Sequence, residues 1–168
     1  MTAPLAIRRR AIPAGFGLIA AALAIVLMVL ASVPARAQDD TAEILALLER
    51  WAATYSSPDA TPEAMLELYD PDSVFWGTGA RTPFVGAAEI GPYFGQQFAN
   101  FPVRKVSFVE SIVRVYGDAA TVTGLYRFEV QTRSGQQADV THRYSYALAR
   151  GETGWRLVHQ HSSAMPPQ

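Results

Sequence analysis

Residues 119–130 read AATVTGLYRFEV, and their apolar and polar side chains alternate with a period of two. Such alternation is typical of a β-strand with one face buried in the core and the other facing solvent. Further strands are predicted within residues 103–115, 140–149 and 155–163, because turn-forming residues separate these apolar stretches. The second half of the chain therefore predicts a run of antiparallel hairpins.

The first half of the mature sequence predicts helices. Residues 40–55 carry apolar side chains at helical spacing, a second helix is expected from Pro62 to Tyr69, and a third from Ala87 to about Phe98. Asp70-Pro71-Asp72 predicts a turn and Val74–Trp76 a short strand. Helices that precede a run of hairpins indicate an α+β fold. We expect three helices packed in the concavity of a curved antiparallel sheet, forming a cone with a polar pocket where it stays open.

The N-terminal 37 residues differ from the rest of the chain. Arg8, Arg9 and Arg10 precede a long apolar run, and a small-x-small site at residues 35–37 follows it. This order predicts a signal peptide at residues 1–37, with a weak hint of a twin-arginine signal. We expect one domain at 38–168, exported to the periplasm or secreted, with no stable membrane association after cleavage. An uncleaved membrane anchor is the alternative.

The composition excludes some classes of function. Residues 1–37 contain four of the 14 basic residues and none of the 15 acidic ones, so the mature chain has a net charge of −5. Such a surface argues against a nucleic-acid partner, because phosphates require a basic face. The chain has no cysteine, which excludes disulfides, a thiolate nucleophile and cysteine metal ligands.

The densest group of polar residues is the run from His159 to Ser163, HQHSS. Strand alternation places His159, His161 and Ser163 on one face and Gln160 with Ser162 on the other. His159 and His161 could bind one metal ion, for which His142 is the candidate third ligand. The alternative is that these histidines are structural groups at the end of a strand.

Three other side chains are candidates for the pocket. Arg143 could bind an anion through its guanidinium, or instead be solvated or paired with Glu129 or Asp139. The Thr78 hydroxyl and the Tyr93 phenol could hydrogen-bond a small ligand. Taken singly, Thr78 is equally consistent with a loop residue and Tyr93 with a core residue.

The C-terminal run GWRLVHQHSSAMP, residues 154–166, resembles the calcium/calmodulin-dependent protein kinase II association-domain family of the nuclear transport factor 2-like superfamily. It is most similar to a bacterial branch that ends Trp-x-Ile-Val-x-His-His-Ser-Ser-x-Met-Pro. Weaker similarities cover residues 68–69, 74–78, 90, 93–94 and 143–146. The resemblance spans about residues 41–166.

That branch includes the iota-class carbonic anhydrases. The resemblance implies a cone-shaped α+β fold, usually dimeric, with a pocket for carbon dioxide or bicarbonate. It also implies that Thr78, Tyr93 and a serine of the pair Ser162-Ser163, with the neighbouring His161, line this pocket. Ser162 is the first choice of the two serines. Gln160 departs from the family pattern, because the branch has a histidine at this position.

The leading hypothesis is an enzyme, a carbonate dehydratase that hydrates carbon dioxide reversibly. Either His159 and His161 hold zinc or manganese, which activates water, or no metal is present and hydroxyls hold bicarbonate while a histidine moves the proton. The rival is a non-catalytic module that binds a small carboxylate through Arg143 and Gln160 or mediates oligomerisation. An isomerase or hydrolase is a third option. A homodimer is expected in each case.

Overall fold

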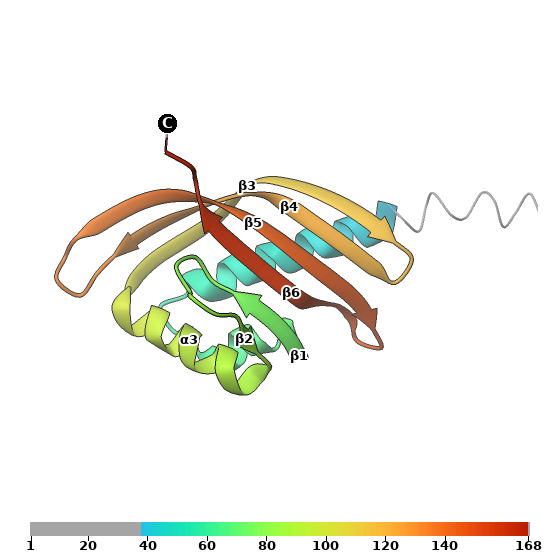
Figure 1. Cartoon of the computed structure of the whole chain (residues 1–168), viewed down its shortest axis with the longest axis horizontal. Helices are drawn as coiled ribbons and strands as arrows, with labels where there is room; N and C mark the ends of the chain where they lie inside the picture. The colour runs from blue at the N-terminus through green and yellow to red at the C-terminus, as the bar shows by residue number, and fades with distance from the viewer. Residues whose placement is uncertain (1–37, 168) are drawn as a thin grey trace, which may run out of the picture. The chain divides into compact units, whose positions relative to one another are not determined.

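The computed structural model describes residues 38–167, so the predicted signal peptide lies outside the described residues. Within that range no helix is both long and apolar enough to cross a membrane. The described chain is an α+β unit in which helices lie beneath one curved sheet (Figure 1). The predicted fold class is confirmed.

The helices agree with the sequence expectation except at one end. The first occupies residues 38–56, and its predicted apolar face is buried. Helix α2, Pro62–Leu66, has Pro62 in its first turn, and Thr61 Oγ1 accepts a hydrogen bond from the Ala64 N–H at 3.2 Å. We predicted that this helix would reach Tyr69, but the chain leaves it earlier because Tyr69 begins a strand. Helix α3 spans Ala87–Asn100.

Six strands form the sheet in the order β2-β1-β6-β5-β4-β3. Their bounds are β1 Tyr69–Trp76, β2 Phe84–Val85, β3 Val103–Tyr116, β4 Ala119–Gln131, β5 Gln137–Gly151 and β6 Gly154–Ala164. All neighbouring strands are antiparallel except β1 and β6, which pair in parallel. The expectation of a purely antiparallel sheet was therefore wrong, because β1 and β6 are not joined by a hairpin: β2, α3 and strands β3 to β5 lie between them in the chain.

Strand β1 also corrects the turn predicted at residues 70–72. Its pairing with β6 moves from Tyr69 opposite Leu157 to Val74 opposite His159, with an irregularity between the two pairs. Asp70-Pro71-Asp72 lies within this irregular part of the strand. Its turn-forming residues produce a local break in the ladder instead of a reversal of the chain. The two-residue strand β2 was not predicted.

The core lies between the helices and the concave face of the sheet, and it is rich in aromatic residues. Trp51 of the first helix stacks on Tyr55 with 5.3 Å between ring centroids, and it meets Tyr126 of β4 at 6.4 Å. Phe75 of β1 contacts Phe94 of α3 at 5.5 Å. The inward face of β4 is the one predicted from its alternation: Ala120, Val122 and Tyr126 are buried.

A buried arginine joins the ends of two helices to β3. Arg104 Nε donates to the Tyr55 carbonyl at 2.7 Å, and its terminal nitrogens donate to the carbonyls of Ser57 and Phe101. These acceptors lie at the C-terminal ends of the first helix and α3, where carbonyls lack helical partners. The guanidinium also lies 4.2 Å from the centroid of the Phe98 ring. Arg104 therefore caps both helices with one charged group.

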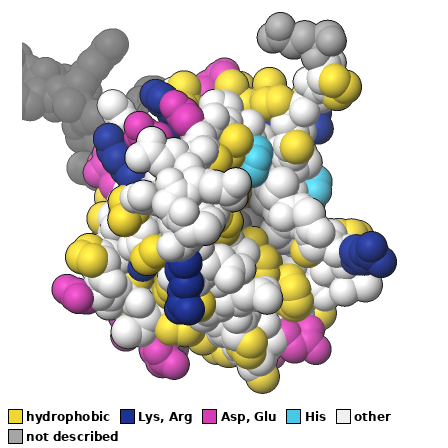
Figure 2. All heavy atoms as spheres, turned by 90° about the vertical axis from the view of Figure 1, so that its left-hand side faces the viewer, with side chains coloured by type: hydrophobic (Ala, Val, Ile, Leu, Met, Phe, Trp, Pro, Cys, Tyr) yellow, Lys and Arg dark blue, Asp and Glu magenta, His cyan; other side chains and the backbone are white. Residues whose placement is uncertain are grey.

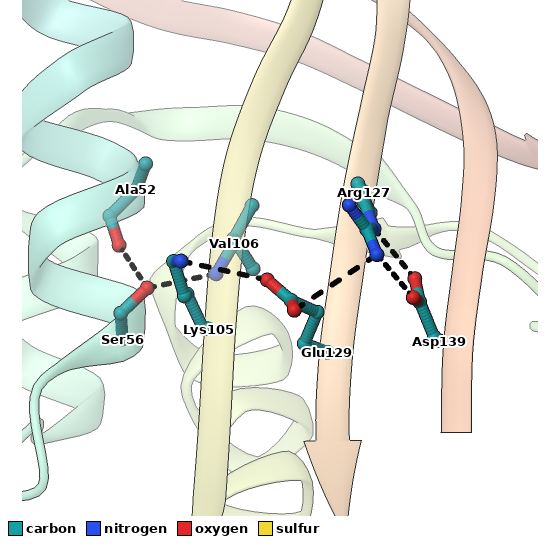
Figure 3. A network of polar contacts seen from close by, with 7 residues as sticks. All are labelled: Ala52, Ser56, Lys105, Val106, Arg127, Glu129 and Asp139. Carbon is teal, nitrogen blue, oxygen red and sulfur yellow. Dashed lines mark hydrogen bonds and ion pairs between the residues drawn. The ribbon is translucent and has the colours of Figure 1, made fainter.

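Two polar networks lie near this junction (Figure 3). Ser56 Oγ donates to the Ala52 carbonyl at 2.6 Å and accepts from the Val106 N–H at 2.9 Å, which ties the helix to β3. On the outer face of the sheet, Arg127 pairs with Asp139 and lies 4.0 Å from Glu129. Both networks cross between elements, but only the first is shielded from solvent.

Candidate functional site

A cavity of about 270 Å³ lies between the concave face of the sheet and the helices. Polar side chains gather at one part of its wall, and aromatic and aliphatic side chains form most of the rest. On the face drawn in Figure 2, histidine side chains lie near hydrophobic ones. The polar lining comprises Thr78, Tyr93, Gln97, Tyr126, His142, Gln160 and Ser162.

The cavity brings Thr78 and Ser162 together, although 84 positions separate them in the chain. Thr78, in the loop after β1, donates its hydroxyl proton to Ser162 Oγ at 2.7 Å. Side chains two residues apart on a strand share a face, so Ser162 lies on the same inward face of β6 as Gln160, and both are buried. Both hydroxyls also interact with the Tyr126 hydroxyl, and these hydrogen bonds partly oppose the rise in the Tyr126 pKa that burial causes.

His142 on β5 completes this polar cluster. Its Nδ1 lies 3.4 Å from Thr78 Oγ1. Because Thr78 donates its proton to Ser162, its oxygen can only accept here, so the tautomer that satisfies this contact carries its proton on Nδ1 and has the lone pair on Nε2. Burial lowers the His142 pKa below its ordinary value of 6.5, so the imidazole is neutral at pH 7. His142 therefore has the protonation state of a general base.

Tyr93 of α3 reaches the same cavity because Gly77 makes room for it. A Cβ on Gly77 would lie 2.5 Å from the Tyr93 hydroxyl oxygen, so a larger residue would push the phenol away. Burial raises the pKa of Tyr93 to about 12, so its hydroxyl stays protonated at neutral pH. Thr78, Tyr93 and Ser162, which the resemblance selected, thus line one cavity.

Gln160 is buried at the cavity wall and is the end of a chain of hydrogen bonds. Trp51 Nε1 donates to the Tyr69 hydroxyl at 2.7 Å, and Tyr69 donates to Gln160 Oε1 at 2.5 Å. The predicted shared face of Gln160 and Ser162 is the face that lines the cavity. A neutral amide therefore stands where the related branch has a histidine.

The other predicted site residues lie away from the cavity lining. His161 is exposed and contacts Trp76, with 6.3 Å between ring centroids. Ser163 pairs with Arg143 across β5 and β6, so both alternate with the cavity-facing residues. Arg143 is exposed and donates to the Ala164 carbonyl at 3.2 Å. His159 is partly buried beside Val74 and Ala147 in the ladder and does not line the cavity.

The donor set of the cavity does not fit a zinc or manganese ion. Catalytic zinc takes three protein ligands from His, Cys, Asp and Glu. Among the residues that line the cavity, only His142 belongs to these types. Residues 38–167 contain no group of three or more such side chains placed to hold a metal ion. The chemistry of this cavity is therefore derived from its own hydroxyl, amide and imidazole groups.

Sequence reasoning missed several residues of the cavity. Tyr126 lies on the inward face predicted for residues 119–130, and Trp51 on the predicted apolar face of the first helix. Both positions predicted burial and indicated nothing about a polar role. Sequence reasoning had also treated His142 only as a third metal ligand, whereas the structure places it beside Thr78.

Comparison with known proteins gives a family and a fold. A family model described as a SnoaL-like domain matches residues 44–167. None of the curated protein sequences matches the chain significantly. Among solved structures, a protein from Xanthomonas campestris, provisionally described as a calcium/calmodulin-dependent protein kinase II association domain, is 28% identical with a TM-score of 0.68. That match covers 75% of this chain and 88% of the other.

Two further structures are each 25% identical with a TM-score of 0.70. One, from Novosphingobium aromaticivorans, is provisionally described as an aromatic ring hydroxylase, and the match covers 77% of this chain and 91% of that one. The other is a nuclear transport factor 2-like superfamily protein from Salmonella enterica serovar Typhimurium, with 78% and 94% covered. Structures less than 25% identical include a ketosteroid isomerase-like protein and show the shared fold alone.

Proposed function

The chain belongs to the SnoaL-like domain family, and we propose that it is an enzyme that hydrates carbon dioxide to bicarbonate without a metal ion. The observation that carries this proposal is the cluster of Thr78, Ser162 and His142 inside one cavity. The Ser162 hydroxyl accepts the Thr78 proton and can donate its own to an oxygen atom of a ligand, and the neutral imidazole beside it can act as a base for water. The family and fold leave the reaction open, since related folds host unrelated activities.

The proposed reaction has one chemical step. Carbon dioxide lies with one oxygen toward the hydroxyls of Ser162 and Tyr126, which both line the cavity. A water molecule beside His142 attacks the carbon and forms the new C–O bond, while one proton of that water passes to Nε2. One C–O double bond becomes a single bond, and its electron pair becomes the bicarbonate charge. The imidazolium then loses its proton to solvent, so carbon dioxide and water yield bicarbonate and one proton.

Several features of the site support these roles. The lowered pKa of His142 keeps Nε2 free to accept a proton at pH 7. The raised pKa values of Tyr93 and Tyr126 keep their hydroxyls protonated as donors. Donors that are already in place stabilise developing negative charge on oxygen without reorganising during the reaction. Gln160 provides no titratable group where the related branch has a histidine, but the base His142 and the donors Tyr93 and Tyr126 are all present.

A second candidate is a non-catalytic module that binds small molecules. The observation that favours it is Gln160, which cannot transfer a proton where the related branch has a histidine. A carboxylate ligand bound through Arg143 is less well supported, because Arg143 is exposed and is not part of the cavity lining. This candidate predicts binding without turnover.

Stopped-flow measurement of carbon dioxide hydration by the purified protein, with and without a chelator, separates the two candidates. We expect a rate above buffer that the chelator leaves unchanged and that Thr78→Val and Ser162→Ala reduce. Ser145→Ala is the matched control, since Ser145 is exposed on β5 and does not line the cavity. A rate no greater than that of buffer, with or without added zinc or manganese, would contradict the proposed reaction.

Export to the periplasm or the medium and assembly as a homodimer complete the proposal. Export is supported by the residue order at positions 1–37. The dimer is supported by the resemblance to a family whose members are usually dimeric. Cell fractionation with N-terminal sequencing tests the first, and sedimentation velocity tests the second.

A further inference from the structure

The hydrogen-bond chain from Trp51 to Gln160 has a direction that its chemistry imposes. An indole N–H can only donate, so the Tyr69 oxygen is the acceptor of the Trp51 bond. The Tyr69 hydroxyl is buried, and its own proton goes to the Gln160 side chain. A buried hydroxyl proton needs an acceptor, and the amide offers only its oxygen. The orientation of the Gln160 amide is therefore set by Trp51, two residues away in the chain of bonds.

This orientation turns the amide nitrogen of Gln160 away from Tyr69. Gln160 lines the cavity, and its Nε2 has no hydrogen-bond partner among residues 38–167. Burial raises the Tyr69 pKa well above 10, so the hydroxyl remains a donor at neutral pH. The cavity thus receives N–H donors from Gln160, in addition to the hydroxyls of the polar cluster.

The rest of the cavity is larger and more aromatic than carbon dioxide requires. Its volume of about 270 Å³ is far more than a single small molecule such as water needs, which is on the order of 10–15 Å³. Much of the remaining wall is aromatic, and it includes Trp51, Tyr55, Phe75, Phe94, Phe101 and Phe128. Apolar walls with a few converging polar groups are typical of sites for organic ligands.

We infer that Gln160, held by Tyr69 and Trp51, is a specificity-determining residue that selects ligands carrying an acceptor oxygen on an apolar ring. A carbonyl oxygen accepts from the Gln160 amide, and the ring occupies the aromatic part of the cavity. Tyr69 is a positioning residue in this scheme, because it acts through Gln160. The inference uses the same cavity as the proposed function but does not require turnover.

Two ligands of matched shape test the inference: acetophenone, with a C=O group, and α-methylstyrene, with C=CH₂ in its place. Titration calorimetry or ligand-observed NMR with the purified protein gives the ratio of their affinities. We expect the wild-type protein to prefer the ketone about fivefold, the value of one neutral hydrogen bond. Gln160→Met should remove most of this preference. Tyr69→Phe should reduce it about twofold or more, because the freed amide can turn its oxygen inward.

Tyr146→Phe is the matched control for Tyr69→Phe. Tyr146 lies opposite Gln160 in the ladder, and its buried hydroxyl has no hydrogen-bond partner in the described part of the chain. We expect this variant to keep the wild-type preference. A purely structural role of Tyr69 would weaken both ligands equally and leave the ratio unchanged, which would overturn its assignment.

Three outcomes overturn the inference as a whole: no binding of either ligand, equal affinities in the wild type, or an unchanged preference in Gln160→Met. The wild-type ratio alone decides the first two if a variant fails to fold. Carbon dioxide hydration is measured separately, so the two proposals can fail independently. If the protein prefers the ketone but does not hydrate carbon dioxide, only this inference stands. If it hydrates carbon dioxide but does not bind the ketone, only the proposed function stands.

Discussion

The two faces of the hairpin formed by β5 and β6 differ sharply although their residues alternate along the same strands. On the inner face, His142, Gln160 and Ser162 line the cavity. On the outer face, Arg143 and His161 are exposed. The two sets contain similar side chains, but only the inner set is shielded from water and placed beside other polar groups. The chemistry of a side chain here depends on the face it occupies more than on its residue type.

The same contrast holds for the charged residues of the sheet. Arg104 is buried on the inner face and donates to three backbone carbonyls. Arg127 is exposed on the outer face and pairs with Asp139 and Glu129. Solvent screens the second group and not the first, so equal substitutions on the two faces should have unequal effects.

The largest expected effect is on stability, at Arg104. We expect Arg104→Met to lower the free energy of unfolding by about 4 kcal/mol, because it removes the buried side chain that donates to three carbonyls at the C-terminal ends of two helices. Urea denaturation followed by circular dichroism measures this loss. A loss below about 1 kcal/mol would show that the inner face shields this cation no better than the outer face shields Arg127.

The next effect concerns the two histidines on opposite faces. We expect His142→Gln to lower the rate of carbon dioxide hydration about 100-fold, which is typical of the loss of a general base. His161→Gln should change the rate much less, because His161 is not part of the cavity lining. Stopped-flow hydration assays compare the two variants. A greater loss in His161→Gln would move the proposed chemistry to the outer face.

The two neighbouring serines provide a smaller contrast. Ser162→Ala should reduce the hydration rate about tenfold, the loss expected for one hydrogen bond in the transition state. Ser163→Ala should cost less, since Ser163 alternates with the cavity-facing residues. The same assay measures both variants, with Ser145→Ala as the control. Equal losses for the two serines would contradict the assignment by strand alternation.

The pH dependence of stability tests the environment of His142. Its folded pKa is lower than the unfolded value of about 6.5, so the unfolded chain binds more protons as the pH falls below that value. We therefore expect the contribution of neutral His142 to be complete above pH 6.5 and to be lost progressively below it. Urea denaturation at a series of pH values should show a shallower acid loss in His142→Gln. An identical acid loss would indicate that His142 is solvated.

The smallest expected effect is on the outer face, at the exposed ion pair. Arg127→Met should leave the free energy of unfolding nearly unchanged, because water and salt screen exposed pairs. The pair should also weaken with added sodium chloride, whereas Arg104 should not respond. Urea denaturation at low and high salt measures the difference. A large, salt-insensitive loss would mean that another surface shields this face.

Much of the fold could be predicted from periodicity. The alternation in residues 119–130 and the helical spacing of Ile44, Leu47, Leu48, Trp51 and Tyr55 each reflect one buried face, and a buried face leaves a repeating pattern. The β1 strand was harder to predict, because Asp70-Pro71-Asp72 has the residues of a turn yet lies in an irregular part of a strand. The local preference of these residues for a turn is overridden by the pairing of β1 with β6, and no local sequence pattern indicates that pairing.

The candidate site could be predicted only in part. Strand alternation placed Gln160 and Ser162 on one face and His161 on the other, and only Gln160 and Ser162 line the cavity. The resemblance selected Thr78 and Tyr93, which also line it. The role of His142 could not be predicted, since nothing in its neighbourhood in the chain indicates contact with Thr78, 64 positions away.

The α+β class, the inward faces of the helices and strands, and the absence of cysteine chemistry can all be predicted before the chain folds. These properties depend on residue type and local spacing. The pairing of polar groups across the fold cannot be predicted in this way: Thr78 meets Ser162, His142 meets Thr78, and Trp51 reaches Gln160 through Tyr69. The physical reason is that hydrogen bonds act over about 3 Å, and folding alone brings residues tens of positions apart within that distance.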